Sequence, residues 1–276
     1  MTVRIPLIPL PQARIPTRPD MPGADSHGQT VYAVTLVRHG RTAYNAAGKL
    51  QGQVDIPLND TGLWQADRTA QALYERYVKG SGRTPIVVSS PLERACQTAE
   101  RFAQLAGVQV AVDERVKERS FGEWEGCRWS DLEQNYPRDF GMWKRFQDGE
   151  MRHGAEAKAS VGRRGALAVE DWASRAGQDH ELFVFSHGAW ISQTAQKLMH
   201  LDVVDPTYAS ISGPDNGHWV RFRVLRTLDG ALLWRMTEFN RGPSVEPGVD
   251  WNDPFAANGP GEDSAHDTAA AVPPVL

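Results

Sequence analysis

The chain has 276 residues, of which 41% are hydrophobic and 23% charged, as expected for a globular protein with a sizeable core. Its net charge of −4 argues against nucleic acid or an anionic membrane surface as a partner, so any bound anion needs a local cluster of positive charge. The two cysteines, Cys96 and Cys127, show no metal or redox spacing, so we expect reduced thiols and a cytoplasmic location. No apolar run is long enough to predict a membrane span.

The two ends of the chain differ from its middle in composition. Residues 1–29 carry prolines inside a short apolar patch and are predicted to form an extended arm. Residues 241–276 are rich in Pro, Gly, Asp and Ala and are predicted to form a flexible tail, which Trp251 and Phe255 are candidates to pin to the body. The intervening residues 30–240 are predicted to form the folded domain.

Strand-like and helix-like patterns alternate along this middle part. Nearly continuous apolar runs predict buried strands at 31–37, 85–91 and 181–188, and "HWVRFRVLRT" and "ALLWRMTEF" predict a final hairpin. Helical spacing of apolar residues predicts helices within the ranges 57–78, 91–105, 160–176 and 189–201. This order predicts an α/β protein, a three-layer α/β/α sandwich with a mostly parallel central sheet and an antiparallel strand near one edge. Residues 119–153 fit poorly and are interpreted as a helical, cap-like insertion over the active-site end.

Polar residues follow each of the three central strands. The first is followed by Arg38-His39-Gly40, the second ends in Ser89-Ser90-Pro91, and the third ends in Ser186-His187-Gly188. Because ligands bind at the carboxyl ends of the strands in open parallel sheets, we expect these loops to meet at one edge. Arg94, one turn inside the second helix, can lean toward the same edge. Two arginines and the backbone N–H groups of helix amino ends, including that at Gly188, favour a phosphate dianion.

Four segments in this order, "RHGRTAYN", "SSPLERACQTA", "ERSFGEWEG" and "FSHG", resemble the histidine phosphatase superfamily, also called the phosphoglycerate-mutase-like family. The resemblance spans about residues 31–226. It implies that His39 is the nucleophile that accepts the phosphoryl group, while Arg38, Arg94 and His187 surround that group.

The same resemblance implies roles for residues outside these four. Asn45 ends the first motif and would donate a hydrogen bond to phosphate, and Glu118, which precedes "FGEWEG", matches the proton donor. Arg119 is an additional candidate for substrate binding because it follows Glu118 directly. Arg41 departs from the family, which often has Glu or Gln there, and has no assigned role.

The chemistry of phosphoryl transfer is compatible with these assignments. The transition state is loose, so positioning and charge stabilisation carry most of the catalysis. A nucleophilic imidazole must be neutral, and we expect its other N–H to be held by a backbone carbonyl. Glu118 can protonate the departing alkoxide only if its pKa is raised. No metal or other cofactor is required by this scheme.

"FGEWEG" resembles the phosphatase branch, so we predict a phosphomonoester hydrolase acting on a small phosphorylated metabolite. The alternatives are a cofactor-dependent phosphoglycerate mutase, a non-catalytic module that binds a phospholigand, and a metal hydrolase using His39 and His187. Specificity is expected to reside in residues 119–153, where Lys144, Arg145 and Arg152 would suit a sugar phosphate or a phosphoglycerate-like ester. A homodimer is left open.

Overall fold

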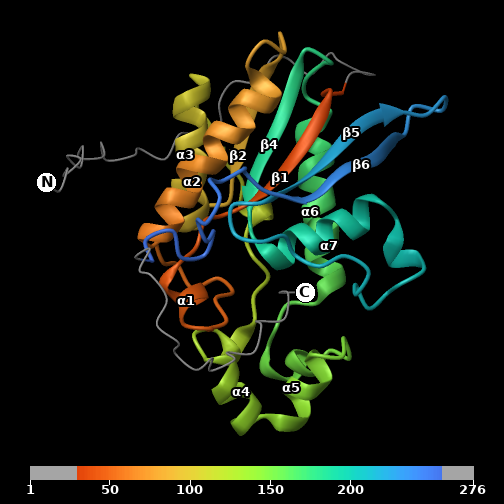
Figure 1. Ribbon diagram of the computed structural model, residues 1–276. Helices are drawn as coiled ribbons and strands as arrows, with labels where there is room; N and C mark the ends of the chain where they lie inside the picture. The colour runs from red at the N-terminus through yellow and green to blue at the C-terminus, as the bar shows by residue number, and fades with distance from the viewer. Residues whose placement is uncertain (1–29, 257–276) are drawn as a thin grey trace, which may run out of the picture.

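The computed structural model describes residues 30–256, in which six strands form one mixed sheet between two layers of helices (Figure 1). The strand order is β3-β2-β4-β1-β5-β6. Strands β3, β2, β4 and β1 run parallel, β5 is antiparallel to β1, and β6 is antiparallel to β5. The strands are β1 (Ala33–Arg38), β2 (Thr84–Ser89), β3 (Val110–Val112), β4 (His180–Ser186), β5 (Trp219–Arg226) and β6 (Leu232–Arg241).

This architecture confirms the predicted α/β sandwich, its mostly parallel sheet and its final hairpin. The sequence reading missed β3, because a three-residue strand is too short to show a periodic pattern. The α-helices of the described part of the chain are α1 (Ala43–Ala46), α2 (Asp60–Leu73), α3 (Glu93–Ala106), α4 (Trp129–Asn135), α5 (Pro137–Trp143), α6 (Lys158–Ala173) and α7 (Gly188–Leu198). None of the helices in residues 30–256 is long and apolar enough to cross a membrane.

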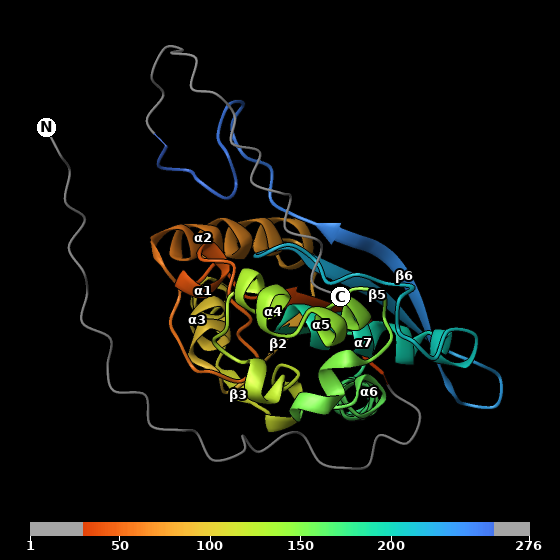
Figure 2. The ribbon, with the colours of Figure 1, turned by 90° about the horizontal axis from the view of Figure 1, so that it is seen from below.

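Two apolar cores hold the helices against the sheet. Alternate side chains of each buried strand point to opposite faces, so Leu36 packs with α6 and α7 whereas its neighbour Val37 packs with α2 and α3. The view along the strands shows these helix pairs on opposite sides of the sheet (Figure 2). The two cores fix the strands in the interior and leave their carboxyl ends free to build a site.

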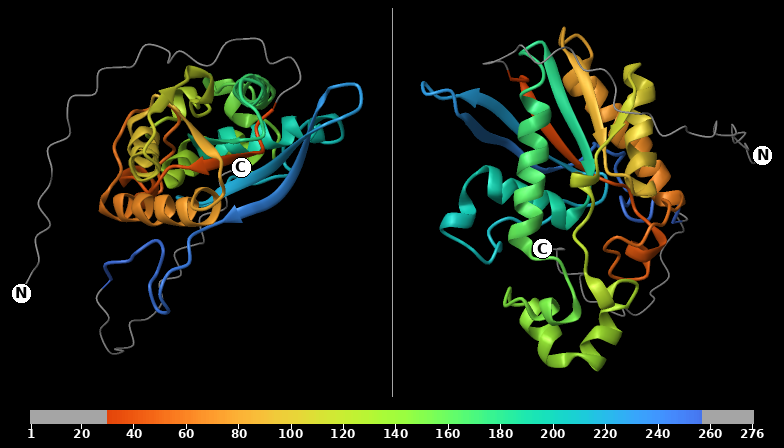
Figure 3. Two further views of the ribbon diagram at one scale, coloured as in Figure 1. Left: turned by 90° about the horizontal axis from the view of Figure 1, so that it is seen from above. Right: turned by 180° about the vertical axis from the view of Figure 1, so that it is seen from behind.

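A third apolar cluster lies at the carboxyl ends of the strands. Helices α4 and α5 form a separate lobe below the sheet (Figure 3, right). Trp124 is fully buried at the centre of this lobe, and its indole lies 5.8 Å from that of Trp143 and 6.1 Å from the ring of Phe140. The cluster also includes Leu50 and Ala189, so it joins the lobe to the end of the sheet. The predicted helical insertion is therefore present and covers this end.

Residues 242–256 follow β6 and return to the outer side of α2. Trp251 packs against Trp64 with ring centroids 5.1 Å apart, and its indole N–H donates to the carbonyl of Asn216 at 2.8 Å. Phe255 is 62% exposed, so only Trp251 of the two expected anchors is packed. The predicted arm at 1–29 and the rest of the predicted tail, 257–276, lie outside the described residues.

Candidate active site

The register of the parallel strands brings the two histidine-bearing loops together. Arg38 at the end of β1 is the partner of Ser186 at the end of β4, so His39 and His187 each follow a paired position. Their rings are 5.1 Å apart and fully buried or nearly so. Ser90 occupies the corresponding place after β2, since its backbone N–H donates to the carbonyl of Phe185 at 3.0 Å. Three strand ends thus converge as the sequence predicts.

The ring of His39 is held in one orientation by two contacts. Its Nδ1 lies 2.6 Å from the carbonyl oxygen of Gly40, and its Nε2 lies 3.3 Å from the Nε of Arg94. A carbonyl can only accept and a guanidinium can only donate, so Nδ1 carries the proton and Nε2 presents a lone pair. Burial, together with the charges of Arg94 and Arg38, lowers the pKa of His39 well below 6.5. His39 is therefore neutral and its Nε2 is unprotonated, as a nucleophile requires.

Gly40 brings the His39 loop into direct backbone contact with the start of α2. A Cβ built on Gly40 would lie 2.4 Å from the carbonyl oxygen of Gly62, so a side chain has no room there. The Gly40 N–H also donates to the Oγ1 of Thr98 at 3.1 Å. These contacts fix the backbone that orients His39.

Arg38 and Arg94 bring two guanidinium groups to the buried base of the site. Arg94 is fully buried, and its Nη1 and Nη2 donate to the carbonyls of Val54 and Gly52, both at 2.8 Å. Burial lowers the pKa of Arg94 to about 10, which leaves it charged at neutral pH. Arg38 donates from Nη1 to the carbonyl of Pro214 at 2.8 Å. None of these acceptors is a carboxylate, so both positive charges remain available to an anion.

Two buried nitrogen atoms of the site lack a hydrogen-bond partner among residues 30–256. They are the Nε of Arg38 and the Nδ1 of His187. His187 is otherwise held through its Nε2, which lies 2.8 Å from the Oγ of Ser90. Gly188 follows His187, and a Cβ there would lie only 3.4 Å from the Nε of Arg38. Because unpaired buried polar groups are costly, this arrangement favours a ligand that supplies the missing acceptors.

Glu118 is 7% exposed and closes the site from the side of the lobe. Its Oε1 accepts from the backbone N–H groups of Arg119 and Trp190, at 2.7 and 2.9 Å, and its Oε2 accepts from that of Ala189 at 3.3 Å. Two of these donors belong to the first turn of α7, directly after His187 and Gly188. Burial raises the pKa of Glu118, while the three N–H donors and Arg94 oppose that rise. A raised pKa at this position is the property that a carboxyl group needs to exchange a proton with a bound ligand.

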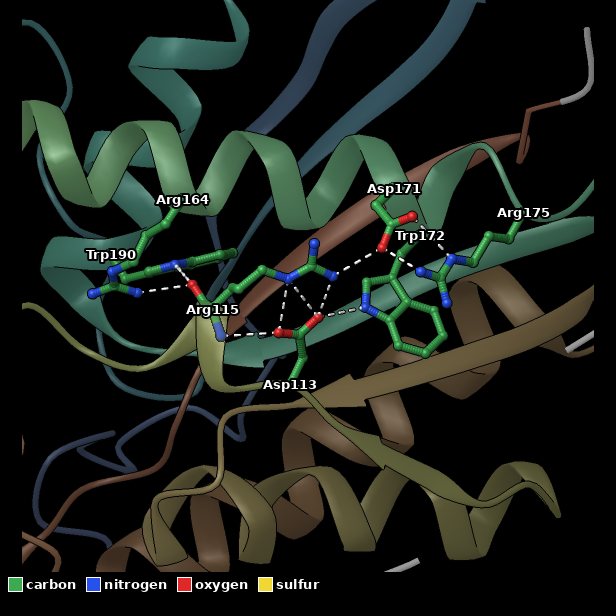
Figure 4. Close-up of polar contacts among 7 residues, drawn as sticks. All are labelled: Asp113, Arg115, Arg164, Asp171, Trp172, Arg175 and Trp190. Atoms are coloured by element: carbon green, nitrogen blue, oxygen red, sulfur yellow. Dashed lines mark hydrogen bonds and ion pairs between the residues drawn. The ribbon is translucent and has the colours of Figure 1, made fainter. Parts of the chain in front are cut away.

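A polar network from α6 and α7 holds the loop that carries Glu118 (Figure 4). Arg164 donates to three carbonyls of this loop, those of Arg115, Lys117 and Glu118, at 2.8, 2.7 and 3.0 Å. The indole N–H of Trp190 donates to the carbonyl of Arg115 at 2.9 Å, and Arg115 pairs in turn with Asp113 and Asp171. Glu118 therefore sits on a loop whose backbone is fixed by side chains of α6 and α7.

The pocket around these residues has a volume of about 400 Å³, which suits a small metabolite. Four of the five predicted catalytic residues line it, and the fifth, His187, is fully buried with its ring 5.1 Å from that of His39. Asn45 lines the same pocket, and its Oδ1 accepts from the backbone N–H of Thr42 at 3.1 Å and from the Nδ2 of Asn216 at 3.4 Å. These bonds occupy the amide oxygen and leave the amide N–H groups for a ligand. The lining residues are Arg38, His39, Arg41, Asn45, Gly48, Lys49, Leu50, Gln51, Gly52, Arg94, Glu118, Phe121, Trp129, Asp215, Asn216 and Asn252.

The expected contact of Arg119 with substrate is wrong for this geometry. Arg119 is fully buried outside the pocket lining, and its Nη2 pairs with the equally buried Glu150 at 2.7 Å. Its Nε donates to the carbonyl of Glu156 at 2.7 Å. Arg119 therefore ties the lobe to the base of α6 instead of reaching the substrate.

The cations expected to set specificity are also placed elsewhere. Lys144 pairs with Glu133 and Arg152 pairs with Asp139, and neither they nor Arg145 line the pocket. The lobe contributes apolar surface instead, through Phe121 and Trp129.

Sequence reasoning missed several residues that support the site. Gln51 lines the pocket and its Oε1 accepts from the hydroxyl of Thr42 at 2.9 Å, while Asn216 donates to the carbonyl of His39 at 3.0 Å. Ser90 and Thr98, whose contacts with His187 and Gly40 are given above, stand in the sequence only as parts of a motif. Their proximity arises from tertiary contacts that no local pattern records.

Comparison with known proteins agrees with this geometry. The family model described as histidine phosphatase superfamily (branch 1) matches residues 34–234. A glucosyl-3-phosphoglycerate phosphatase of Mycolicibacterium vanbaalenii is 29% identical over 234 residues, which cover 78% of this chain and 97% of that protein.

Solved structures give the same picture. A mycobacterial glucosyl-3-phosphoglycerate phosphatase in complex with VO3 superposes with a TM-score of 0.65 at 26% identity, covering 76% of this chain and 99% of its own. An Entamoeba histolytica phosphoserine phosphatase mutant in complex with phosphoserine gives a TM-score of 0.60 at 29% identity, covering 75% of this chain and 96% of its own. Each of these relatives is named for the hydrolysis of a small phosphate ester.

Proposed function

The chain belongs to the histidine phosphatase superfamily and is a phosphomonoester hydrolase, and we propose that it works through a phosphohistidine on His39 with Glu118 as the proton donor. The observation that carries this proposal is the state of His39. Its Nδ1 proton is bound by the Gly40 carbonyl, and its unprotonated Nε2 lies within 3.3 Å of Arg94 at the base of an anion-binding pocket. This is the geometry that an attacking imidazole needs.

The first half of the reaction transfers the phosphoryl group to the enzyme. The Nε2 lone pair of His39 forms a bond to phosphorus while the bond from phosphorus to the ester oxygen breaks. Arg38 and Arg94 stabilise the charge on the equatorial oxygens, and His187 and Asn45 complete the set of donors. Glu118 gives its proton to the departing alkoxide, so the alcohol leaves neutral. The incoming dianion raises the pKa of Glu118 further, which keeps the proton in place until transfer.

The second half returns the enzyme to its starting state. The Glu118 carboxylate takes a proton from a water molecule as that water attacks phosphorus, and the bond between phosphorus and Nε2 breaks. Inorganic phosphate leaves, and Glu118 is again protonated. The same residue acts as acid and then as base because it lies on the leaving-group side in both steps.

The proposal is tested with an aryl phosphate and 3-phosphoglycerate. Wild-type enzyme should release phosphate from both, and His39→Ala should lose activity by a factor of about a thousand or more, because no other group replaces the nucleophile. His180→Ala, at the opposite end of β4, is the matched control. Equal activity in wild type and His39→Ala would rule out this mechanism. Isomerisation of 3-phosphoglycerate that far exceeds phosphate release would instead favour the mutase alternative.

The substrate class proposed for the chain is a small phosphate ester of the kind its relatives hydrolyse, such as glucosyl-3-phosphoglycerate or phosphoserine. A homodimer and a cytoplasmic location, both considered from the sequence, stay predictions. A panel of phosphorylated metabolites assayed by phosphate release, together with light scattering of the purified enzyme, tests the substrate class and the oligomeric state.

A further inference from the structure

Arg41 is a cation without a counter-ion at the opening of the catalytic pocket. Its side chain is half-buried in the pocket lining, and no carboxylate of residues 30–256 lies within ion-pair distance of it. Its hydrogen bond within this part of the chain runs from Nη1 to the carbonyl oxygen of Asn252. The Nε and Nη2 donors of Arg41 therefore have no protein acceptor there. A partly desolvated guanidinium with free donors is a binding group for an anion.

The backbone of Arg41 is rigidly placed. Its N–H donates to the Oε1 of Gln65 at 2.8 Å, and its carbonyl accepts from the N–H of Asn59 at 3.1 Å. A Cβ on Gly62 would lie 1.9 Å from the Arg41 carbonyl oxygen, so the amino end of α2 is pressed directly against this residue. The base of the side chain is thus held by α2, two residues after His39.

The tip of Arg41 is held by a segment from the other end of the fold, residues 250–253, which we call the C-terminal strap. Trp251 anchors the strap through its ring contact with Trp64 and its indole bond to Asn216. Its carbonyl also accepts from the Nε2 of Gln65 at 2.9 Å. The next residue, Asn252, then presents its carbonyl oxygen to Arg41 at the opening of the pocket. The strap thereby orients the guanidinium fork without neutralising it.

Lys49 brings a second cation without a carboxylate partner to the same opening. Its ammonium lies 5.0 Å from the centre of the Tyr44 ring, and no residue from 30 to 256 forms an ion pair with it. Asp215 also lines the opening, but it already accepts from the Nδ2 of Asn240 at 2.9 Å and lies 3.8 Å from the Nδ1 of His218. The two cations outnumber this one carboxylate, so the opening carries net positive charge in addition to that of Arg38 and Arg94 at the base.

We propose that Arg41 and Lys49 bind a carboxylate on the alcohol half of the substrate, so that the enzyme prefers phosphate esters of hydroxy acids to esters of neutral alcohols. The inference rests on the proposed hydrolase function and names the residues of the same pocket that select among its small phosphate esters. The phosphoryl group occupies the base with Arg38 and Arg94, and the remainder of the ester extends toward the opening. A carboxylate matches the planar fork of Arg41 and neutralises it on binding.

The test compares two esters that differ in one group. 3-Phosphoglycerate carries the carboxylate, whereas glycerol 3-phosphate has a hydroxymethyl group in its place. Wild-type enzyme should show the higher kcat/KM with 3-phosphoglycerate. Arg41→Gln should reduce the ratio of the two kcat/KM values by about tenfold, the scale of one charged hydrogen bond. Arg41→Lys should retain part of the preference because it keeps the charge and loses the fork.

The controls separate binding from structure. Arg101→Gln removes an exposed arginine of α3 that pairs with Asp67 away from the pocket, and should leave the ratio unchanged. An equal loss on both esters in Arg41→Gln would mean that Arg41 only tethers the strap, and would overturn the inference. An unchanged ratio would overturn it as well. Absence of phosphate release from either ester in the wild type would instead count against the proposed function itself.

Discussion

The Nε of Arg94 lies 3.3 Å from the Nε2 of His39, so the atom proposed to attack phosphorus already faces a positive charge. This contact has two effects. It disfavours protonation of the imidazole, and it places a guanidinium where the charge of the transferred group develops. Arg94 is itself held by two backbone carbonyls and not by a carboxylate, so its charge is directed to the substrate.

The role of Glu118 predicts a dependence on the leaving group. Glu118→Gln should lower kcat for an alkyl phosphate by about 10²- to 10⁴-fold, the usual contribution of a general acid. An aryl phosphate, whose alcohol leaves without help, should lose much less in the first step. Rapid-quench measurement of alcohol release with both esters checks this prediction. Equal losses for the two esters would show that Glu118 does not deliver the proton.

The network on the Glu118 loop predicts an effect of Arg164 on catalysis. Arg164→Lys keeps the charge, but a lysine ammonium cannot donate hydrogen bonds to all three carbonyls of the loop in the geometry of the guanidinium. We expect kcat for an alkyl phosphate to fall by about ten- to a hundredfold, because a small displacement of the proton donor is costly. The aryl phosphate should be less affected, which a general loss of folding would not produce. Arg163→Lys, an exposed residue on the same helix, is the control and should leave this difference unchanged.

Two buried neutral histidines predict that the protein loses stability in acid. The pKa values of His39 and His187 lie well below 6.5 because burial and nearby arginines disfavour their charged forms. As pH falls below 6.5, the unfolded chain binds protons that the native state cannot bind. The free energy of unfolding should therefore fall by up to about 1.4 kcal/mol per pH unit for each histidine.

Thermal unfolding between pH 7.5 and 5.5, on the order of one unit to either side of an ordinary histidine pKa, checks this prediction. His187→Asn should make the decrease of Tm with falling pH shallower, whatever its effect at neutral pH. An identical slope in wild type and variant would contradict the prediction. Glu118 acts with the opposite sign, since its raised pKa gives stability that is full below 4.5 and lost as pH rises through the raised value.

The proposed chemistry also predicts that metal chelators leave the rate of phosphate release unchanged. The nucleophile is an imidazole and the developing charge is met by two guanidinium groups, so no step calls for a Lewis acid. Phosphate release should be the same before and after extended dialysis against EDTA. Loss of activity that Mg²⁺ or Zn²⁺ restores would support the metal hydrolase considered from the sequence.

The sequence predicted the parts of the site that local patterns encode. Apolar β-branched runs mark the buried strands, so His39 and His187 could be assigned to strand ends and, through the parallel register, to one edge. Arg94 could be assigned because it lies near the start of the helix that follows the second strand, and in the structure it is the second residue of α3. These inferences needed only the periodicity of strands and helices and the topology of parallel sheets.

The remaining features depend on contacts between distant segments. Arg119 and Arg94 are both arginines beside a motif residue, and only the tertiary structure shows that the first pairs with Glu150 while the second faces His39. The sequence assigns no role to Arg41, because the residue that orients it, Asn252, lies 211 positions further along the chain. Long-range pairs of this kind leave no trace in local composition.

Glu118 accepts hydrogen bonds from the N–H groups of Ala189 and Trp190 in the first turn of α7, and it is also the group proposed to give up and regain a proton in each cycle. A neutral carboxyl is a weaker acceptor than a carboxylate, so the hold on that first turn must alternate with the catalytic cycle. The protonation state of this one carboxyl thus couples the leaving-group side of the site to the backbone that follows His187.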